Sequence, residues 1–164
     1  MVEIVRAGLI QQTLLSLSML RQCVERAPDD VYFGGTHPRS FWRIAYHAAA
    51  YAHLYLYPNM DAWKKWPKHR VEATYLEGEV DEIEPYSRAE VLEFIGLIQS
   101  EVAPQIGEMD LEEMDCGYPW YPGLPRFNHQ VLSLRHLHGH IGQLAEILIS
   151  HDIDTDWMGM EESS

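Results

Sequence analysis

Four stretches of this chain carry apolar residues at the three- and four-residue spacing of an amphipathic α-helix. They cover residues 3–25, 40–57, 87–108 and 128–150. No stretch alternates apolar and polar residues as a half-buried β-strand does. Amphipathic helices bury their apolar faces against one another, so the sequence predicts an all-α four-helix bundle formed by one domain, residues 1–164.

The ends of these segments carry recognisable signals. Ser87 and Glu90 have the spacing of a capping box at the start of the third segment. Asn128 is a suitable N-cap for the fourth segment. Pro104 lies inside the third segment, where we expect a kink or an early end of the helix, because proline removes a backbone donor.

The connections between the segments are uneven in length. Residues 58–86 are too many for a tight hairpin, so the second and third helices are expected to run parallel, joined by a crossover. Residues 109–127 contain three prolines and several aromatic residues. Long ordered loops of this kind form either pocket walls and lids or packed surface flaps, and the sequence leaves both open.

Charge and cysteine content narrow the function classes. Lys and Arg number 12 against 25 Asp and Glu, a formal net charge of −13 with no basic stripe. We therefore expect neither nucleic acid nor a membrane as a partner. Two cysteines without a CxxC motif, and an N-terminus unlike a signal peptide, favour a reducing cytoplasm.

The fourth segment contains the histidine-rich stretch RHLHGHIGQL, residues 135–144. His136 and His140 are four residues apart, which places them about 40° apart around a helix and about 6 Å apart along its axis. Two imidazoles arranged in this way can share one metal ion. His138 points to a different face. The alternative interpretation is a pair of histidines that are merely hydrogen bonded or exposed.

His47 lies on the apolar stripe of the second segment, between Ile44 and Tyr51. A histidine on such a stripe is usually a hydrogen-bonded core residue. If the second and fourth helices are neighbours, however, His47 meets His136 and His140, and sites in helical bundles are built from facing helices in this way. Three neutral imidazoles suit zinc, nickel, copper or iron and leave a coordination position for water or substrate.

Three further side chains are candidates for the surroundings of this site. Gln143, one turn beyond the histidine pair, either orients a ligand or polar substrate group or forms a hydrogen bond between helices. His129 precedes the pair by seven residues and either lines the pocket mouth or simply lies near the helix start. Tyr51 follows His47 by one turn and is expected either behind the candidate ligands or in the lining of the pocket.

Two glycines and several other histidines complete the pattern. Gly139 and Gly142 each cost about 1 kcal/mol relative to alanine inside a helix. We expect them to allow close packing of another backbone, which would help short histidine side chains to converge. The remaining histidines are expected at the surface: His37, His53, His69 and His151.

These residues resemble the signature of the DinB/YfiT-like superfamily. Its last helix reads HxxxH followed by G-Q-L, here His136, His140 and residues 142–144, and an earlier histidine in the second helix corresponds to His47. The resemblance covers the whole chain in helix order and length. It implies an up-down-down-up four-helix bundle that forms homodimers and holds one divalent metal ion on the three histidines. Zinc or nickel is expected first, then iron, manganese or copper.

The resemblance also suggests a chemistry. Relatives include mycothiol-dependent maleylpyruvate isomerase and bacillithiol transferases, which use the metal to activate a low-molecular-weight thiol. We therefore expect a metal-dependent transferase acting on such a thiol and an electrophilic substrate, or a hydrolase. The alternative is a non-catalytic, stress-associated metal-binding dimer, because no acid–base partner is evident beside the histidines. The residues do not identify a general base.

Overall fold

The computed structural model describes residues 2–160, and within this range it is all-helical and contains no strand. This confirms the predicted all-α class. The elements are α1 (Val2–Arg26), α2 (Asp29–Tyr32), α3 (Phe41–Leu54), the 3₁₀ helix η1 (Val71–Thr74), α4 (Arg88–Glu108) and α5 (Arg126–Ile149).

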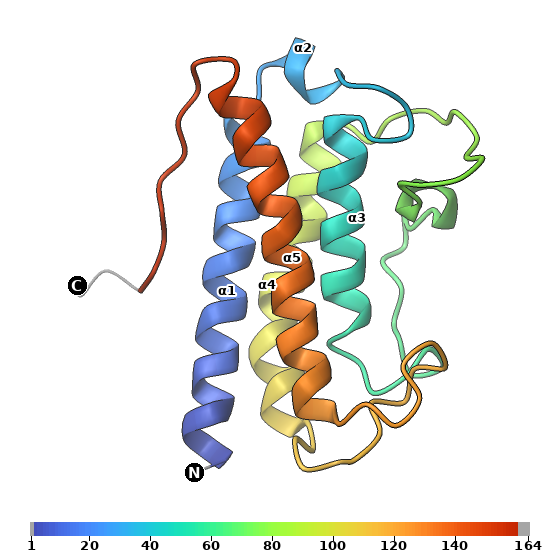
Figure 1. Ribbon diagram of the computed structural model, residues 1–164, viewed down its shortest axis with the longest axis vertical. Coiled ribbons are helices and arrows are strands. Elements are labelled where there is room, and N and C mark those ends of the chain that lie inside the picture. Colours follow the sequence, from blue (N-terminus) through green and yellow to red (C-terminus); the bar gives the residue numbers. More distant parts are fainter. Residues whose placement is uncertain (1, 161–164) are drawn as a thin grey trace.

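Four long helices lie side by side, and α5 lies in front, between α1 and α3, in Figure 1. Helix α1 packs against α4 and α5, and α3 packs against α5 and α4. The connection that follows α3 runs along the outside of that helix, where η1 contacts it. The fold therefore places α3 and α5 next to each other, with η1 beside α3.

The core is formed by the apolar faces of the long helices. Leu20, Tyr46, Ile98 and Leu144, one from each long helix, are fully buried. Burying a side chain of this size contributes about 1.5–3 kcal/mol to folding. Packing of these faces fixes the helices firmly enough to position side chains at their junctions.

A second, smaller cluster attaches the connection between α4 and α5 to the end of α3. Leu54, Tyr55 and Cys116 pack around Tyr118, which is almost fully buried. The Tyr118 hydroxyl lies 2.9 Å from the backbone carbonyl oxygen of Tyr57, to which it donates a hydrogen bond. The aromatic-rich connection is therefore anchored to the helices.

The helix boundaries agree with the sequence signals in part. The predicted capping box is present, because the Ser87 side chain accepts from the Glu90 backbone N–H while the Glu90 side chain accepts from the Ser87 N–H. Helix α4 continues through Pro104 to Glu108, so the predicted early end is not seen. Val102 and Ile106 are fully buried on either side of the proline, and their packing outweighs the lost hydrogen bond.

Two other boundaries differ from expectation. Helix α3 ends at Leu54 rather than near Tyr57. The residues that follow form a tighter turn, because the Tyr57 N–H donates to the Leu54 carbonyl three residues earlier, 3.1 Å away. Helix α5 begins at Arg126 rather than after Asn128, with Pro125 as its N-cap residue. The fixed φ angle of proline is compatible with this position.

The outer face of α5 is more open than predicted. Val131, which continues the apolar stripe in the sequence, is 47% exposed. A methyl group added at Gly139 or Gly142 would meet no described atom within 4 Å. The expectation that another backbone of the chain packs against these glycines is therefore wrong, because the stripe that α5 buries lies on its other side.

None of the helices within residues 2–160 combines the length and the apolar character needed to cross a lipid bilayer.

Candidate metal centre

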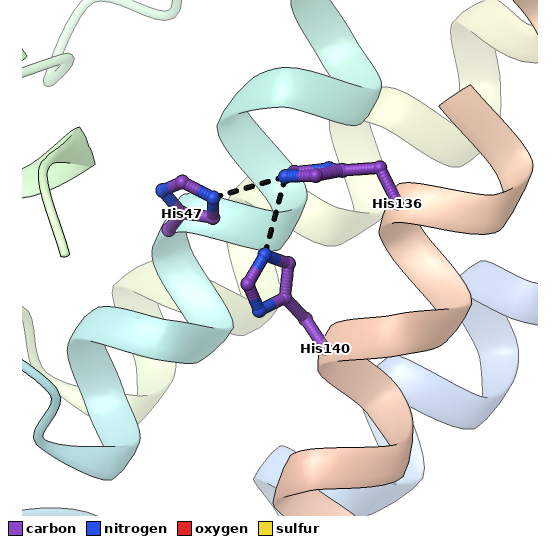
Figure 2. Close-up of side chains that lie close together, drawn as sticks. All are labelled: His47, His136 and His140. Atoms are coloured by element: carbon purple, nitrogen blue, oxygen red, sulfur yellow. Dashed lines mark hydrogen bonds between the residues drawn. The ribbon is translucent and has the colours of Figure 1, made fainter. Parts of the chain in front are cut away.

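Three histidines from two helices converge on one point (Figure 2). His47 comes from α3, and His136 and His140 come from α5. The His136 Nε2 atom lies 3.0 Å from Nε2 of His47 and 3.1 Å from Nε2 of His140. The structure thus brings together the three residues that the sequence singled out as candidate ligands.

The helices themselves account for this convergence. His136 and His140 are one turn apart, so their rings project from the same face of α5 and their centroids lie 4.6 Å apart. His47 lies on the face of α3 that meets α5, with its ring centroid 4.5 Å from that of His140. Each ring is half-buried, so the cluster is partly open to solvent.

The nitrogen spacing fits the coordination of a single metal ion. Three nitrogens bound at about 2.05 Å lie about 3.3 Å apart in a tetrahedral site and about 2.9 Å apart when the ligand angles are 90°. One nitrogen from each histidine lies within 4.8 Å of the others, and two of the three separations are 3.0 and 3.1 Å. These residues could hold a metal ion.

The far nitrogens of two rings have partners that orient them. The Nδ1 atom of His47 lies 2.6 Å from the Thr74 carbonyl oxygen, and Nδ1 of His140 lies 3.0 Å from Oε1 of Gln143. A carbonyl oxygen can only accept, so each Nδ1 carries the proton. Each Nε2 then presents its lone pair to the cluster, as metal-binding histidines do.

Gln143 contacts His140 within α5, and this contact is the arrangement expected of a residue that orients a candidate ligand. Its Oε1 also lies 3.4 Å from the guanidinium of Arg39. The Thr74 carbonyl was missed by sequence reasoning. It is a backbone atom in η1, within a long irregular connection, and no side-chain pattern marks it.

Burial keeps the three imidazoles neutral. Desolvation lowers the pKa of His47 to about 3, although the hydrogen bond to Thr74 acts in the opposite direction. Desolvation and the neighbouring His140 lower the pKa of His136 to about 4. Desolvation also lowers the pKa of His140. Neutral imidazole is the form that binds metal, so no proton has to be displaced from these Nε2 atoms near pH 7.

The cluster faces a cavity of about 420 Å³. Tyr51 lines it, with its ring centroid 4.8 Å from that of His47, as predicted for a pocket residue. Arg39 and Glu77 also line it, and their charged groups are 3.8 Å apart. A small molecule can therefore reach the three nitrogens alongside one cationic and one anionic group.

His129, for which the sequence left open either the pocket mouth or a place near the helix start, does not line this cavity. It is fully buried between Tyr55 and Tyr118, whose ring centroids lie 4.4 and 4.9 Å from its own. Neither of its ring nitrogens has a hydrogen-bond partner among the described residues. The connection that carries Tyr118 covers this turn of α5, which the helical spacing alone could not indicate.

Two other histidines, His138 and His53, have side-chain partners elsewhere in the bundle. His138 faces away from the cluster, as predicted, and its Nδ1 lies 3.3 Å from the hydroxyl oxygen of Ser16 on α1. His53 was expected at the surface but is fully buried, with Nε2 2.9 Å from Glu101 and Nδ1 accepting from Trp63. These partners satisfy both ring nitrogens of His53, which makes it a structural residue.

Comparison with models of known protein families and with curated protein sequences gives no match to this chain.

Proposed function

We propose that this protein is a divalent-metal-dependent enzyme that transfers a low-molecular-weight thiol to an electrophilic substrate. The observation that carries the proposal is the convergence of three Nε2 atoms at an open cavity. Two of the rings are oriented by hydrogen bonds at their Nδ1 atoms. A structural metal site is normally closed by a fourth protein ligand, whereas a catalytic site keeps one position for substrate. Zinc or nickel suits three imidazoles best.

A bound divalent ion would favour the anionic form of a coordinated thiol or water. The residues of the chain contribute binding and orientation. Thr74 and Gln143 fix the His47 and His140 rings. The Arg39 guanidinium gives the cavity a cationic group, which suits a carboxylate of the thiol or of its acceptor.

Within the part of the chain that the structure describes, the cavity offers no well-placed carboxylate for proton transfer, and this favours thiol transfer over hydrolysis. Among the described residues, Glu77 is the carboxylate that lines it, and its side chain is 90% exposed and paired with Arg39. Such a group is poorly placed to hold a proton for hydrolysis. A thiol needs less help, because its ordinary pKa is about 8.5, far below that of water. Hydrolysis remains the second catalytic candidate.

We further propose that the chain is an up-down-down-up four-helix bundle of the DinB/YfiT-like superfamily, acting as a cytoplasmic homodimer. Support comes from the order of the long helices, from their course in Figure 1, and from the ligand pattern. One candidate ligand lies on the second long helix and two lie on the last. The open glycine face of α5 leaves room for a second copy.

A non-catalytic metal-binding protein is the competing function, and the lack of a well-placed carboxylate favours it. A turnover screen separates the two. Protein loaded with zinc or nickel is mixed with several thiols and an electrophilic aryl halide, and thioether formation is followed. We expect turnover that is lost in His47→Ala and His136→Ala and retained in the control His138→Ala.

Each outcome of this screen is informative. Stoichiometric metal without turnover for any thiol would favour the non-catalytic protein. Turnover that persists in folded His47→Ala and His136→Ala protein would show that the reaction does not use the histidine cluster.

A further inference from the structure

A second cavity, of about 190 Å³, adjoins the one at the three histidines. The two cavities share Tyr51, Thr74 and Tyr75 as lining residues. The Tyr51 ring centroid is 5.3 Å from that of His136, so about one ring's width separates the second cavity from the candidate ligands. The two cavities therefore adjoin along these three shared residues.

The two cavities differ in chemistry. Among the described residues that line the second cavity there is no carboxylate, lysine or arginine, in contrast to the Arg39 and Glu77 of the first. Apart from the shared residues, it is lined by Ala50, Leu54, Met60, Trp63, His69, Val71 and Trp120. Burial lowers the pKa of His69, so this residue adds no charge near pH 7. The second cavity is thus apolar, with indole rings in its wall.

Its size indicates what it can hold. An apolar cavity of about 150 Å³ accepts benzene, so about 190 Å³ suits one aromatic ring with a small substituent. Aromatic walls favour an aromatic guest through edge and stacking contacts, in addition to the apolar area buried.

We propose that the second cavity binds an aryl group of the thiol, whose reacting sulfur atom lies at the three histidines. Placing the reacting atom at the three histidines depends on the proposed function. Binding of the aryl group in the second cavity does not depend on it. Trp63 comes from the connection after α3, and Trp120 comes from the connection before α5. The two long connections thus form the wall of a specificity pocket rather than surface flaps.

The test compares two thiols that differ only in the aryl group. Binding of 3-phenylpropane-1-thiol and propane-1-thiol to zinc-loaded protein is measured by calorimetry. We expect the phenyl compound to bind at least ten times more tightly. Trp120→Ala should reduce this preference to less than threefold, and Trp120 is 44% exposed, so its loss spares the core. Trp157→Ala, which removes a tryptophan 75% exposed elsewhere, should keep the full preference.

The ratio of the two affinities tests the aryl pocket. Their absolute values test whether the thiol group binds at the histidine cluster. His136→Ala should weaken both thiols together and leave the phenyl preference intact. If both thiols bind wild-type protein equally, or if Trp120→Ala keeps the wild-type preference, the aryl pocket is refuted. If the preference follows the prediction while the protein turns over no substrate, the aryl pocket stands and the proposed enzymatic function fails.

Discussion

Acid should destabilise this protein through His129, a residue outside the candidate metal centre. The His129 ring is fully buried, and neither ring nitrogen has a partner among the described residues. Desolvation, with a smaller effect from Arg126, lowers its pKa from 6.5 to about 4. In the unfolded chain the same imidazole has a pKa of about 6.5.

The sign of the effect follows from proton binding. As the pH falls from about 6.5 towards 4, the unfolded chain takes up a proton at His129 and the native protein does not. Unfolding is therefore favoured progressively across this range. With these two pKa values, the free energy of unfolding falls by about 2 kcal/mol between pH 7.5 and pH 5.0 because of His129 alone.

The assay is urea unfolding of metal-free protein at both pH values, for wild type and His129→Phe. Phenylalanine keeps a ring between Tyr55 and Tyr118 but has no titrating nitrogen. The loss of stability between pH 7.5 and 5.0 should be about 2 kcal/mol smaller in the variant than in wild type. His151→Phe, at an exposed site, should match wild type. An equal loss in wild type and His129→Phe would refute the reasoning.

Three further substitutions test other parts of the structure. Gln143→Leu removes the acceptor that orients His140 and should weaken zinc binding about 10–100-fold in a competition titration with a chelator. Gly117→Ala should reduce the free energy of unfolding by about 1–3 kcal/mol more than Gly123→Ala in chemical denaturation. Both glycines have positive φ angles, but a methyl group at Gly117 would overlap the Pro58 carbonyl, whereas one at Gly123 meets nothing within 4 Å. Ser87→Ala removes the capping box of α4 and should cost about 1 kcal/mol in the same assay.

The helices and the histidine cluster were predictable because both depend on local periodicity. His136 and His140 share a face through a four-residue spacing, and His47 lies on the stripe that its helix turns towards α5. One further assumption, that the two helices are neighbours, was enough to bring the three side chains together. The packing of α3 against α5 confirms that assumption.

The surroundings of the cluster depend on irregular segments, where periodicity gives no guidance. The Thr74 carbonyl reaches His47 only because the connection after α3 folds back beside that helix. His129 is buried because Tyr118, eleven residues earlier, folds over its turn of α5. Pro104 is tolerated because of long-range packing around Val102 and Ile106. Each of these depends on contacts between segments that the sequence does not mark.

Metal content is the most direct test of the central claim, which is that His47, His136 and His140 together hold one divalent ion. Purified protein is stripped of metal, reloaded with zinc, desalted and assayed for metal per chain by elemental analysis. The same procedure is applied to the three single His→Ala variants and to the control His138→Ala. We expect one ion per chain in wild type and control and none in each of the three variants. One ion per chain in any folded variant of the three, or none in wild type, would contradict it.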